Sequence, residues 1–382
     1  MSINTYFTDF LSNIRLSDAQ KQDLIKGHTL LRERLADFDD LKDDIVTTFL
    51  QGSYRRATAV SPLNGKRADV DLIVVTNLKR EDYSAEEAIA KFIPFVEKHY
   101  KGKYRIQGRS IGIELSYVDL DIVVTSAPSE ADKKALLSES VRTQLSLEDF
   151  PLNYDWRLAD LWVEPDLSSN VVFLSEAARK TPEWKLSALY IPDREAEEWV
   201  QTHPLEQIRW TQKKNKATNG HYVNVVKALK WWRTGKLTDL KYPKGYPIEH
   251  MIGDCCPDGI TSVAEGICLT MESIVSTYSL YRNARVTPTL PDRGVPDHDV
   301  WKRVSADDFC TFYDAVKDCA KSARKALDSS SLKEKVEIWR DILGSKFPKY
   351  EGPNDSDAKN TLSSGPYTPR TKNSEPTETR FA

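Results

Sequence analysis

The chain has 382 residues, of which 40% are hydrophobic and 29% charged, and 54 Lys and Arg against 57 Asp and Glu give a formal net charge of −3. This length suffices for about two or three domains with substantial cores, and it excludes a peptide hormone or a disulfide-stabilised miniprotein. The near-neutral balance argues against a protein that coats nucleic acid, because such binding requires an excess of cationic side chains to neutralise phosphates.

The first part of the chain predicts helices around a mixed β-sheet. Apolar residues recur at helical spacing behind Ser17, a good capping residue, and predict a helix as far as Asp37. The stretch 84–100 is also helical in pattern, and Pro94 bends or divides it. β-branched and apolar runs predict four strands, at 45–50, 69–75, 110–117 and 118–125.

The second part of the chain predicts mainly helices. A Trp- and Pro-containing stretch at 145–202 has weak periodicity, and we expect it to wrap the surface or bridge two lobes. Apolar residues then recur at helical spacing over 219–235 and 305–327. The final stretch 351–382 is rich in Ser, Thr and Pro with few apolar residues, which predicts a disordered tail.

These patterns together predict an α/β fold with three parts. We expect residues 1–200 to form a lobe built on the mixed sheet, with N-terminal helices, and residues 201–350 to form a helical lobe. Residues 351–382 are the predicted tail.

Three aspartates on the predicted strands carry the strongest chemical signal. Asp69 and Asp71 project to the same side of an extended strand, because side chains alternate with a period of two. Like charges this close need a counter-charge, and carboxylate oxygens are ligands that Mg²⁺ prefers. Asp121 from a neighbouring strand completes a site for two ions, the arrangement used for in-line phosphoryl displacement.

The turn after the first predicted strand, QGSYRRAT at 51–58, supplies groups for a triphosphate. Gly52 allows the backbone to approach phosphate closely, and Ser53 offers a hydroxyl and an amide. Arg55 or Arg56 adds positive charge for an anionic transition state. A lone Gly-Ser is usually a turn, but its combination with two acidic strand motifs indicates nucleotidyl transfer.

These motifs resemble those of the polymerase-β-like nucleotidyltransferase superfamily. Within it, the block DVDLIVVTNL at 69–78 and the helix KALKWWR at 227–233 resemble the cGAS/DncV-like nucleotidyltransferases (CD-NTases) of bacterial antiphage signalling. The resemblance covers nearly the whole chain. Stretches such as FLQGSYRRAT, QGRSIGIELSY, THPLEQIRWT and YPKGYPIEH are similar to clade D of that family.

The resemblance implies a polymerase-β-like nucleotidyltransferase lobe and a helical lobe with the active site between them. It implies synthesis of a cyclic oligonucleotide from nucleoside triphosphates with release of pyrophosphate, and clade D favours an adenine-rich cyclic trinucleotide. ATP is the expected substrate, GTP is left open as a second, and two Mg²⁺ ions are the expected cofactor, with Mn²⁺ as a substitute.

The resemblance also assigns roles to residues. Those expected to be catalytic and to bind Mg²⁺ are Asp69, Asp71 and Asp121, with Asp121 helping to deprotonate the attacking ribose hydroxyl. Those expected to bind nucleotide are Gln51, Gly52, Ser53, Arg56, Lys230 and Tyr246.

Two of these assignments have alternatives. Lys230 matches the position of a family lysine that contacts the triphosphate, with Lys227 one turn earlier as the less favoured candidate; the alternative is that both cover the solvent face of an amphipathic helix. Relatives often carry a serine where Gly245 stands here, so Tyr246 is expected to stack on a base instead.

A zinc site is suggested by composition and opposed by spacing. His250 lies near Cys255, Cys256 and Cys268, but there is no C-x₂-C pair, and Cys268 falls within the apolar helical pattern at 262–275. We therefore expect no zinc.

The remaining sequence features concern the setting of the protein. Five cysteines, an odd number, favour reduced thiols, and no stretch approaches the length of a membrane span, so a cytoplasmic protein without a membrane partner is expected. The resemblance implies an effector activated by the cyclic product. It also suggests that an E1/E2-like protein conjugates the C-terminal carboxylate of Ala382, with a plain solubilising tail as the alternative.

Rival functions are a cyclic dinucleotide synthase and a template-free RNA or tRNA nucleotidyltransferase. The second would need a basic surface for a polynucleotide, which the near-neutral charge balance does not supply. A nucleotide-binding pseudoenzyme is opposed by the intact aspartates.

Overall fold

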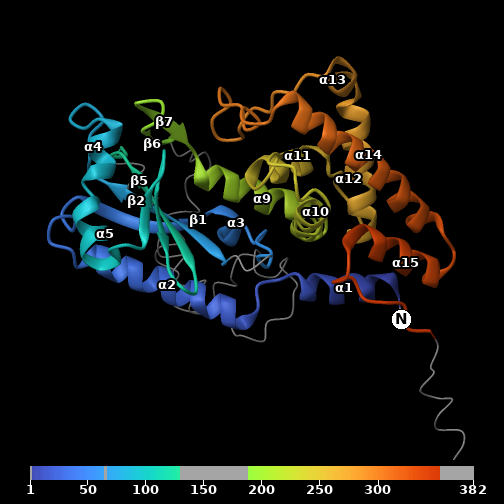
Figure 1. Cartoon of the computed structure of the whole chain (residues 1–382). Helices are drawn as coiled ribbons and strands as arrows, with labels where there is room; N and C mark the ends of the chain where they lie inside the picture. The colour runs from blue at the N-terminus through green and yellow to red at the C-terminus, as the bar shows by residue number, and fades with distance from the viewer. Residues whose placement is uncertain (1, 64–66, 130–187, 353–382) are drawn as a thin grey trace, which may run out of the picture.

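The computed structural model describes residues 2–63, 67–129 and 188–352, which form a sheet lobe and a helical lobe (Figure 1). The predicted tail from residue 353 onward and most of the stretch 145–202 lie outside the described residues. The division at about residue 200 stays a prediction. The described residues do show a β-sheet in the first part of the chain and mainly helices in the second.

The sheet lobe is built on a mixed sheet. In the described residues five strands pair in the order β1-β2-β5-β4-β3, and β2 and β5 are parallel while the other neighbours are antiparallel. The strands are β1 (Ile45–Gln51), β2 (Asp69–Thr76), β3 (Tyr104–Ile106), β4 (Ile111–Glu114) and β5 (Asp119–Thr125). The central strands are almost wholly apolar after their first residues, so the acidic residues lie at one end of a buried sheet.

Helices cover this sheet, and a hairpin extends the lobe. The helix α2 (Asp18–Ala36) runs along one face, and α4 (Ala85–Ala90) and α5 (Ile93–Tyr100) pack at the far end (Figure 1). The hairpin of β6 (Leu189–Asp193) and β7 (Glu198–Thr202) leads into the helical lobe. The weak periodicity of 145–202 did not predict this hairpin.

The helix boundaries follow local chemistry. Ser17 and Gln20 form a reciprocal capping box at the start of α2, so the predicted helix is confirmed. Pro94 stands in the first turn of α5 and separates it from α4, because proline donates no backbone N–H and is tolerated at a helix start. The predicted strand at 110–117 is shorter, ending at Glu114.

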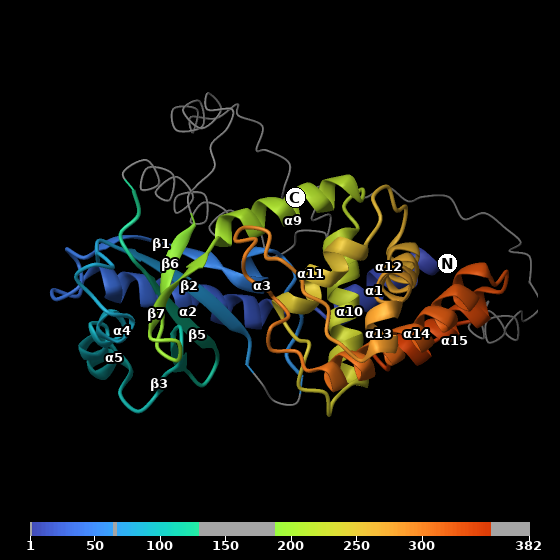
Figure 2. The same cartoon turned by 90° about the horizontal axis from the view of Figure 1, so that it is seen from above.

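The helical lobe has its own apolar core. Its helices are α9 (Pro204–Ala217), α10 (Tyr222–Lys236), α11 (Tyr246–Cys255), α12 (Val263–Thr277), α13 (Ser279–Ala284), α14 (Ala306–Asp328) and α15 (Leu332–Leu343). Figure 2 shows α9 running from the sheet lobe toward the other helices. The first helix of the chain, α1 (Ile3–Asn13), packs into this core through aromatic residues, with Phe7 against Trp339 and Phe347. The chain therefore begins in the helical lobe before it builds the sheet.

The contact between α2 and the sheet leaves no room for a side chain at Gly27. A Cβ there would lie 2.7 Å from Val118 Cγ1 and 3.3 Å from Leu120 Cδ2. We expect Gly27→Val to lower the free energy of unfolding by about 1–3 kcal/mol, because it overpacks a filled core. Urea denaturation measures this, with Gly235→Val in α10 as control, since a Cβ at Gly235 meets nothing within 4 Å. Equal midpoints for the two variants would contradict the prediction.

Candidate active site

The pairing of β2 with β5 brings the three aspartates to one edge of the sheet. Asp71 is the register partner of Asp121, and Asp69 is the partner of Asp119. Because the strands are parallel and side chains alternate, Asp69, Asp71 and Asp121 lie on the same side of neighbouring strands. The structure thus places these carboxylates beside one another, as the sequence pattern predicts.

The electrostatics of this edge reflect crowding of like charge. Burial, and then the charges of Asp69 and Asp121, raise the pKa of Asp71 to about 7. Burial also raises the pKa of Asp69, and the charge of Lys230 opposes that rise. The pKa of Asp121 is raised by burial and by the charge of Asp69. Three carboxylates whose ionisation is opposed in this way form a site that a cation would stabilise.

The donor set fits a hard divalent cation. Each group offers carboxylate oxygens only, which suits Mg²⁺ or Mn²⁺ and does not suit zinc held by thiolate and imidazole. In the part of the chain that the structure describes, no three Asp, Glu, His or Cys side chains already stand in the arrangement of a bound metal. Like-charged carboxylates gain nothing by converging when no cation lies between them.

Gly52 sits against the middle aspartate. Gln51 ends β1 as the register partner of Asp71, and Gly52 then turns the chain into the short helix α3 (Gly52–Arg55) with a φ of +74°. A Cβ on Gly52 would lie 1.9 Å from Asp71 Oδ2. Glycine is required here for both its conformation and the close approach of the carboxylate.

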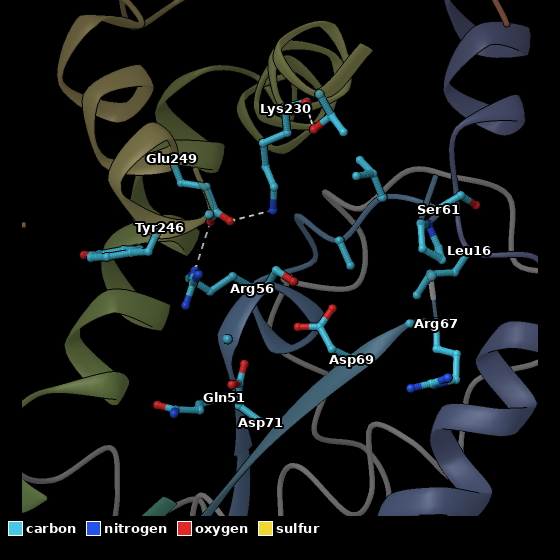
Figure 3. A pocket seen from close by; sticks show the side chains of 18 of the residues that line it. Leu16, Gln51, Arg56, Ser61, Arg67, Asp69, Asp71, Lys230, Tyr246 and Glu249 are labelled. Atoms are coloured by element: carbon cyan, nitrogen blue, oxygen red, sulfur yellow. Dashed lines mark hydrogen bonds and ion pairs between the residues drawn. The ribbon is translucent and has the colours of Figure 1, made fainter. Parts of the chain in front are cut away.

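A cavity of about 490 Å³ lies in front of these groups, between the two lobes (Figure 3). Its volume is typical of a small-molecule site. Asp121 is not among its lining residues, and its Oδ1 accepts a hydrogen bond of 2.9 Å from Gln107 Nε2. The other predicted site residues all line the cavity: Gln51, Gly52, Ser53, Arg56, Asp69, Asp71, Lys230 and Tyr246.

Two cations of the cavity, Arg56 and Lys230, are tied to a glutamate that the sequence analysis did not identify. Glu249 of α11 is 3% exposed, and its two carboxylate oxygens bind Lys230 Nζ at 2.8 Å and Arg56 Nε at 3.1 Å. Burial alone would raise the pKa of Glu249, but Arg56 and Lys230 outweigh it and lower the pKa to about 2. The carboxylate is therefore ionised near neutral pH.

The two lysines of α10 do not cover a solvent face. Lys230 points into the cavity with a side chain 12% exposed, and Lys227 is buried, with its pKa lowered first by burial and then by Arg15 and Lys230. This corrects the alternative of a solvated amphipathic helix, because α10 is enclosed on nearly all sides by the helical core. Trp231 and Trp232 pack in that core.

Tyr246 lies in the cavity wall at the start of α11. The Arg56 guanidinium lies over its ring at 5.0 Å from the centroid, and His250 contacts its edge at a ring distance of 5.7 Å. Tyr246 thus forms a platform beside the cations rather than part of the apolar core.

Arg67 is a further site residue that the sequence analysis missed. It lines the cavity two residues before Asp69, and its Nε donates to Asp119 Oδ1 at 2.7 Å. A cation two residues before the acidic strand was the available signal. Glu249 gave no comparable signal, because its partners are distant in sequence.

The cysteines show no common site. All five lie in the described ranges, each as a buried free thiol, and Cys268 stands in the middle of α12. His250 lies instead against Tyr246, with Nε2 3.4 Å from Asp254 Oδ2. Among the described residues, no helix is both long enough and apolar enough to span a bilayer.

Comparison with known proteins identifies the family. Residues 1–128 match the family described as "Second Messenger Oligonucleotide or Dinucleotide Synthetase domain". A Salmonella paratyphi B protein named "Probable cyclic AMP-AMP-GMP nucleotide synthase" is 47% identical over 391 residues, covering 100% of both chains. The "Cyclic AMP-AMP-GMP synthase" of Enterobacter hormaechei is 46% identical over 395 residues, again covering 100% of both.

A solved structure shows the same fold. The Bradyrhizobium diazoefficiens CD-NTase CdnG, determined in complex with GTP, superposes with a TM-score of 0.61 at 12% identity, covering 89% of this chain and 94% of that one. The expected polymerase-β-like architecture, a mixed-sheet lobe joined to a helical lobe, is therefore confirmed. On this fold, this arrangement of acidic strands and these full-length relatives, the chain belongs to the CD-NTase family of second messenger oligonucleotide synthetases and is a nucleotidyltransferase that makes cyclic oligonucleotides.

Proposed function

We propose that this enzyme joins two AMP units and one GMP unit, taken from ATP and GTP, into cyclic AMP-AMP-GMP. The observation that carries the proposal is the row of Asp69, Asp71 and Asp121, of which Asp69 and Asp71 line, with Gly52, a cavity that Arg56 and Lys230 also line. The product is assigned from relatives at 47% and 46% identity over the whole chain, both named for cyclic AMP-AMP-GMP. An Acinetobacter relative named "Cyclic AMP-AMP-AMP synthase" is 28% identical.

We assign the metal site to the three aspartates. When bound, two Mg²⁺ ions supply charge neutralisation for the attacking and leaving oxygens of the displacement. Mn²⁺ has the same preference for oxygen ligands and is expected to substitute.

The triphosphate is assigned to the space between the two walls of the cavity. Ser53 offers its hydroxyl next to the close approach of Gly52 to Asp71, and Gln51 lines the same side. Arg56 and Lys230 present cationic N–H groups across the cavity, where they can bind phosphate oxygens. The ring of Tyr246 is a surface for stacking a base.

The chemistry needs a group that accepts the proton of the attacking hydroxyl. Gln107 occupies Oδ1 of Asp121, which leaves Oδ2 for that proton. The 3′- or 2′-hydroxyl oxygen of one nucleotide bonds to the α-phosphorus of another, the bond to the β-phosphate bridging oxygen breaks, and pyrophosphate leaves. Repetition on the linear product closes the ring.

The cellular role follows from the product class. A cyclic oligonucleotide is a second messenger, and we place this synthase in antiphage (CBASS) defence in the cytoplasm, acting on an effector that the messenger activates. The expected E1/E2-like partner would act on Ala382, which lies outside the described residues.

Incubation of the purified protein with labelled ATP and GTP and MgCl₂, followed by phosphatase, tests the assignment. The expected result is a small phosphatase-resistant product with AMP and GMP in a ratio of two to one, and mass spectrometry gives its ring size. Chelation with EDTA should abolish it, since the carboxylates alone cannot neutralise the reacting phosphates.

Three other results would contradict the proposal. A resistant product of dinucleotide mass would indicate a cyclic dinucleotide synthase. A long phosphatase-sensitive ladder on added RNA would indicate tailing. Product formation that is unchanged in EDTA would remove the metal-dependent mechanism.

A further inference from the structure

Glu249 joins the sheet lobe to the helical lobe through one buried carboxylate. Its Oε1 binds Lys230 Nζ, and its Oε2 accepts from Arg56 Nε and, at 2.9 Å, from Thr58 Oγ1. Lys230 Nζ also donates to the backbone oxygen of Thr58 at 3.0 Å. Figure 3 shows Glu249 between the two cations.

This network crosses between the lobes. Arg56 and Thr58 belong to the turn after α3, in the sheet lobe, whereas Lys230 and Glu249 stand on α10 and α11 of the helical lobe. Arg56 and Glu249 are 193 residues apart in the chain. Tyr222 of α10 donates to the backbone oxygen of Glu249 at 3.1 Å, which fixes that turn of α11. The carboxylate is thus held from both sides of the cleft.

Glu249 does not use all the N–H groups of Lys230 and Arg56, so each cation keeps donors for a ligand. Among the described residues, Lys230 Nζ has two hydrogen-bond acceptors, Thr58 O and Glu249 Oε1, so one of its three N–H groups remains for a ligand. Arg56 uses Nε on Glu249, and its two terminal nitrogens remain on a guanidinium that lies over Tyr246. Two cations against one carboxylate leave a net positive charge at this wall, opposite the aspartates.

We propose that Glu249 is a positioning residue for nucleotidyl transfer, which orients Arg56 and Lys230 so that their remaining N–H groups converge on the triphosphate of the bound nucleotide. This inference rests on the proposed function, because it assumes that these two cations bind phosphate. By holding one cation from each lobe, the same carboxylate also sets the width of the cleft at the reacting phosphates.

The central test is Glu249→Gln, which keeps the shape of the side chain and removes its charge. We expect kcat/KM for ATP to fall about 100-fold, as for other losses of substrate positioning, with most of the change in KM. Affinity for a non-hydrolysable ATP analogue with Mg²⁺, measured by calorimetry, should fall in parallel. A variant that binds the analogue more tightly would overturn the proposal, since Glu249 would then compete with phosphate for the cations.

A matched control separates positioning from stability. Glu272→Gln removes a carboxylate that bonds Arg324 at 2.8 and 2.7 Å elsewhere in the helical lobe, away from the cavity. It should leave kcat and KM unchanged. If Glu249→Gln lowers the melting temperature but leaves kcat/KM of the folded enzyme intact, Glu249 has a structural role only and the proposal fails.

Two further variants keep the test decisive. Glu249→Asp retains the charge one methylene further back, so it should fold even where the Gln variant does not. Its KM should rise while its kcat changes less. In a Lys230→Met background, the Glu249→Gln exchange should cost much less than in the wild type, because half of what Glu249 orients is already gone. Full additivity of the two losses would contradict a shared role.

The outcome distinguishes this inference from the proposed function. If the wild type binds no nucleotide and makes no cyclic product, the proposed function itself is wrong. If the wild type is active and all Glu249 variants match it, the function stands and only the positioning role is lost.

Discussion

Replacing Asp71 with asparagine is expected to abolish cyclic product formation, with kcat/KM lowered about 10³-fold or more. Asp71 is the middle carboxylate, next to Asp121 in register and two residues from Asp69 on the same strand face. Its loss would remove the carboxylate that lies between the other two in the proposed metal site. The measurement is formation of phosphatase-resistant product from labelled nucleotides.

The same variant, which should lose activity, should gain thermal stability when no metal is present. Because the pKa of Asp71 is raised from 3.8 to about 7 in the folded protein, the folded state retains a proton that the unfolded chain gives up. The contribution of this group to stability therefore falls as the pH rises from about 4 through 7. Asparagine carries no charge to be opposed, so Asp71→Asn should melt at a higher temperature than the wild type at pH 8 in EDTA.

Added Mg²⁺ should reverse this order. It should raise the melting temperature of the wild type, since a cation that binds only the folded state stabilises it, and should have little effect on Asp71→Asn. Asp44→Asn is the matched control, because Asp44 pairs with Lys91 at 2.7 Å just before β1, at the opposite end of that strand from Gln51. Activity in Asp71→Asn near that of the control, or an equal response of both to Mg²⁺, would refute the metal assignment.

The second large effect is expected from Gly52→Ala. The new Cβ would stand 1.9 Å from Asp71 Oδ2, so the carboxylate must leave its position in the acidic row, and a displacement of this size should lower kcat/KM about 100-fold or more. Alanine at the φ of +74° also carries a backbone cost of about 1–2 kcal/mol. Steady-state kinetics and thermal melting measure the two consequences separately.

Gly102→Ala isolates the backbone cost. Gly102 belongs to the same lobe and has a φ of +70°, but a Cβ there meets nothing within 4 Å. Both variants should lose stability, Gly52→Ala by more because its Cβ also displaces Asp71, and only Gly52→Ala should lose activity. If both variants keep full kcat/KM, the close approach at Gly52 is not needed for catalysis.

The acidic edge could be predicted from sequence because its signals are local. A strand side chain's face follows from its position modulo two, so Asp69 and Asp71 share a face whatever the rest of the chain does. The apolar runs after Asp71 and Asp121 identified two buried strands, and the structure pairs these strands directly. The capping box at Ser17 and the break at Pro94 are likewise properties of a few neighbouring residues.

The environment of the cations could not be predicted in this way. The helix α10 is buried on nearly all sides, so its apolar residues do not mark one face. Hydrophobic periodicity therefore cannot tell whether Lys230 points to solvent or into a cavity. The hairpin of β6 and β7 and the docking of α1 against α15 were missed for a related reason, since each depends on a partner surface elsewhere in the chain.

The sequence by itself determined the chemistry of one wall: which strands carry the carboxylates, which glycine approaches them, and hence a nucleotidyltransferase. Only the tertiary structure decided the other wall, where Glu249 meets Arg56 across 193 residues and orients Lys230. The physical reason is one of range. Backbone geometry relates neighbouring residues through fixed periods, whereas a buried ion pair between lobes forms only where folding has already excluded water and brought distant segments together.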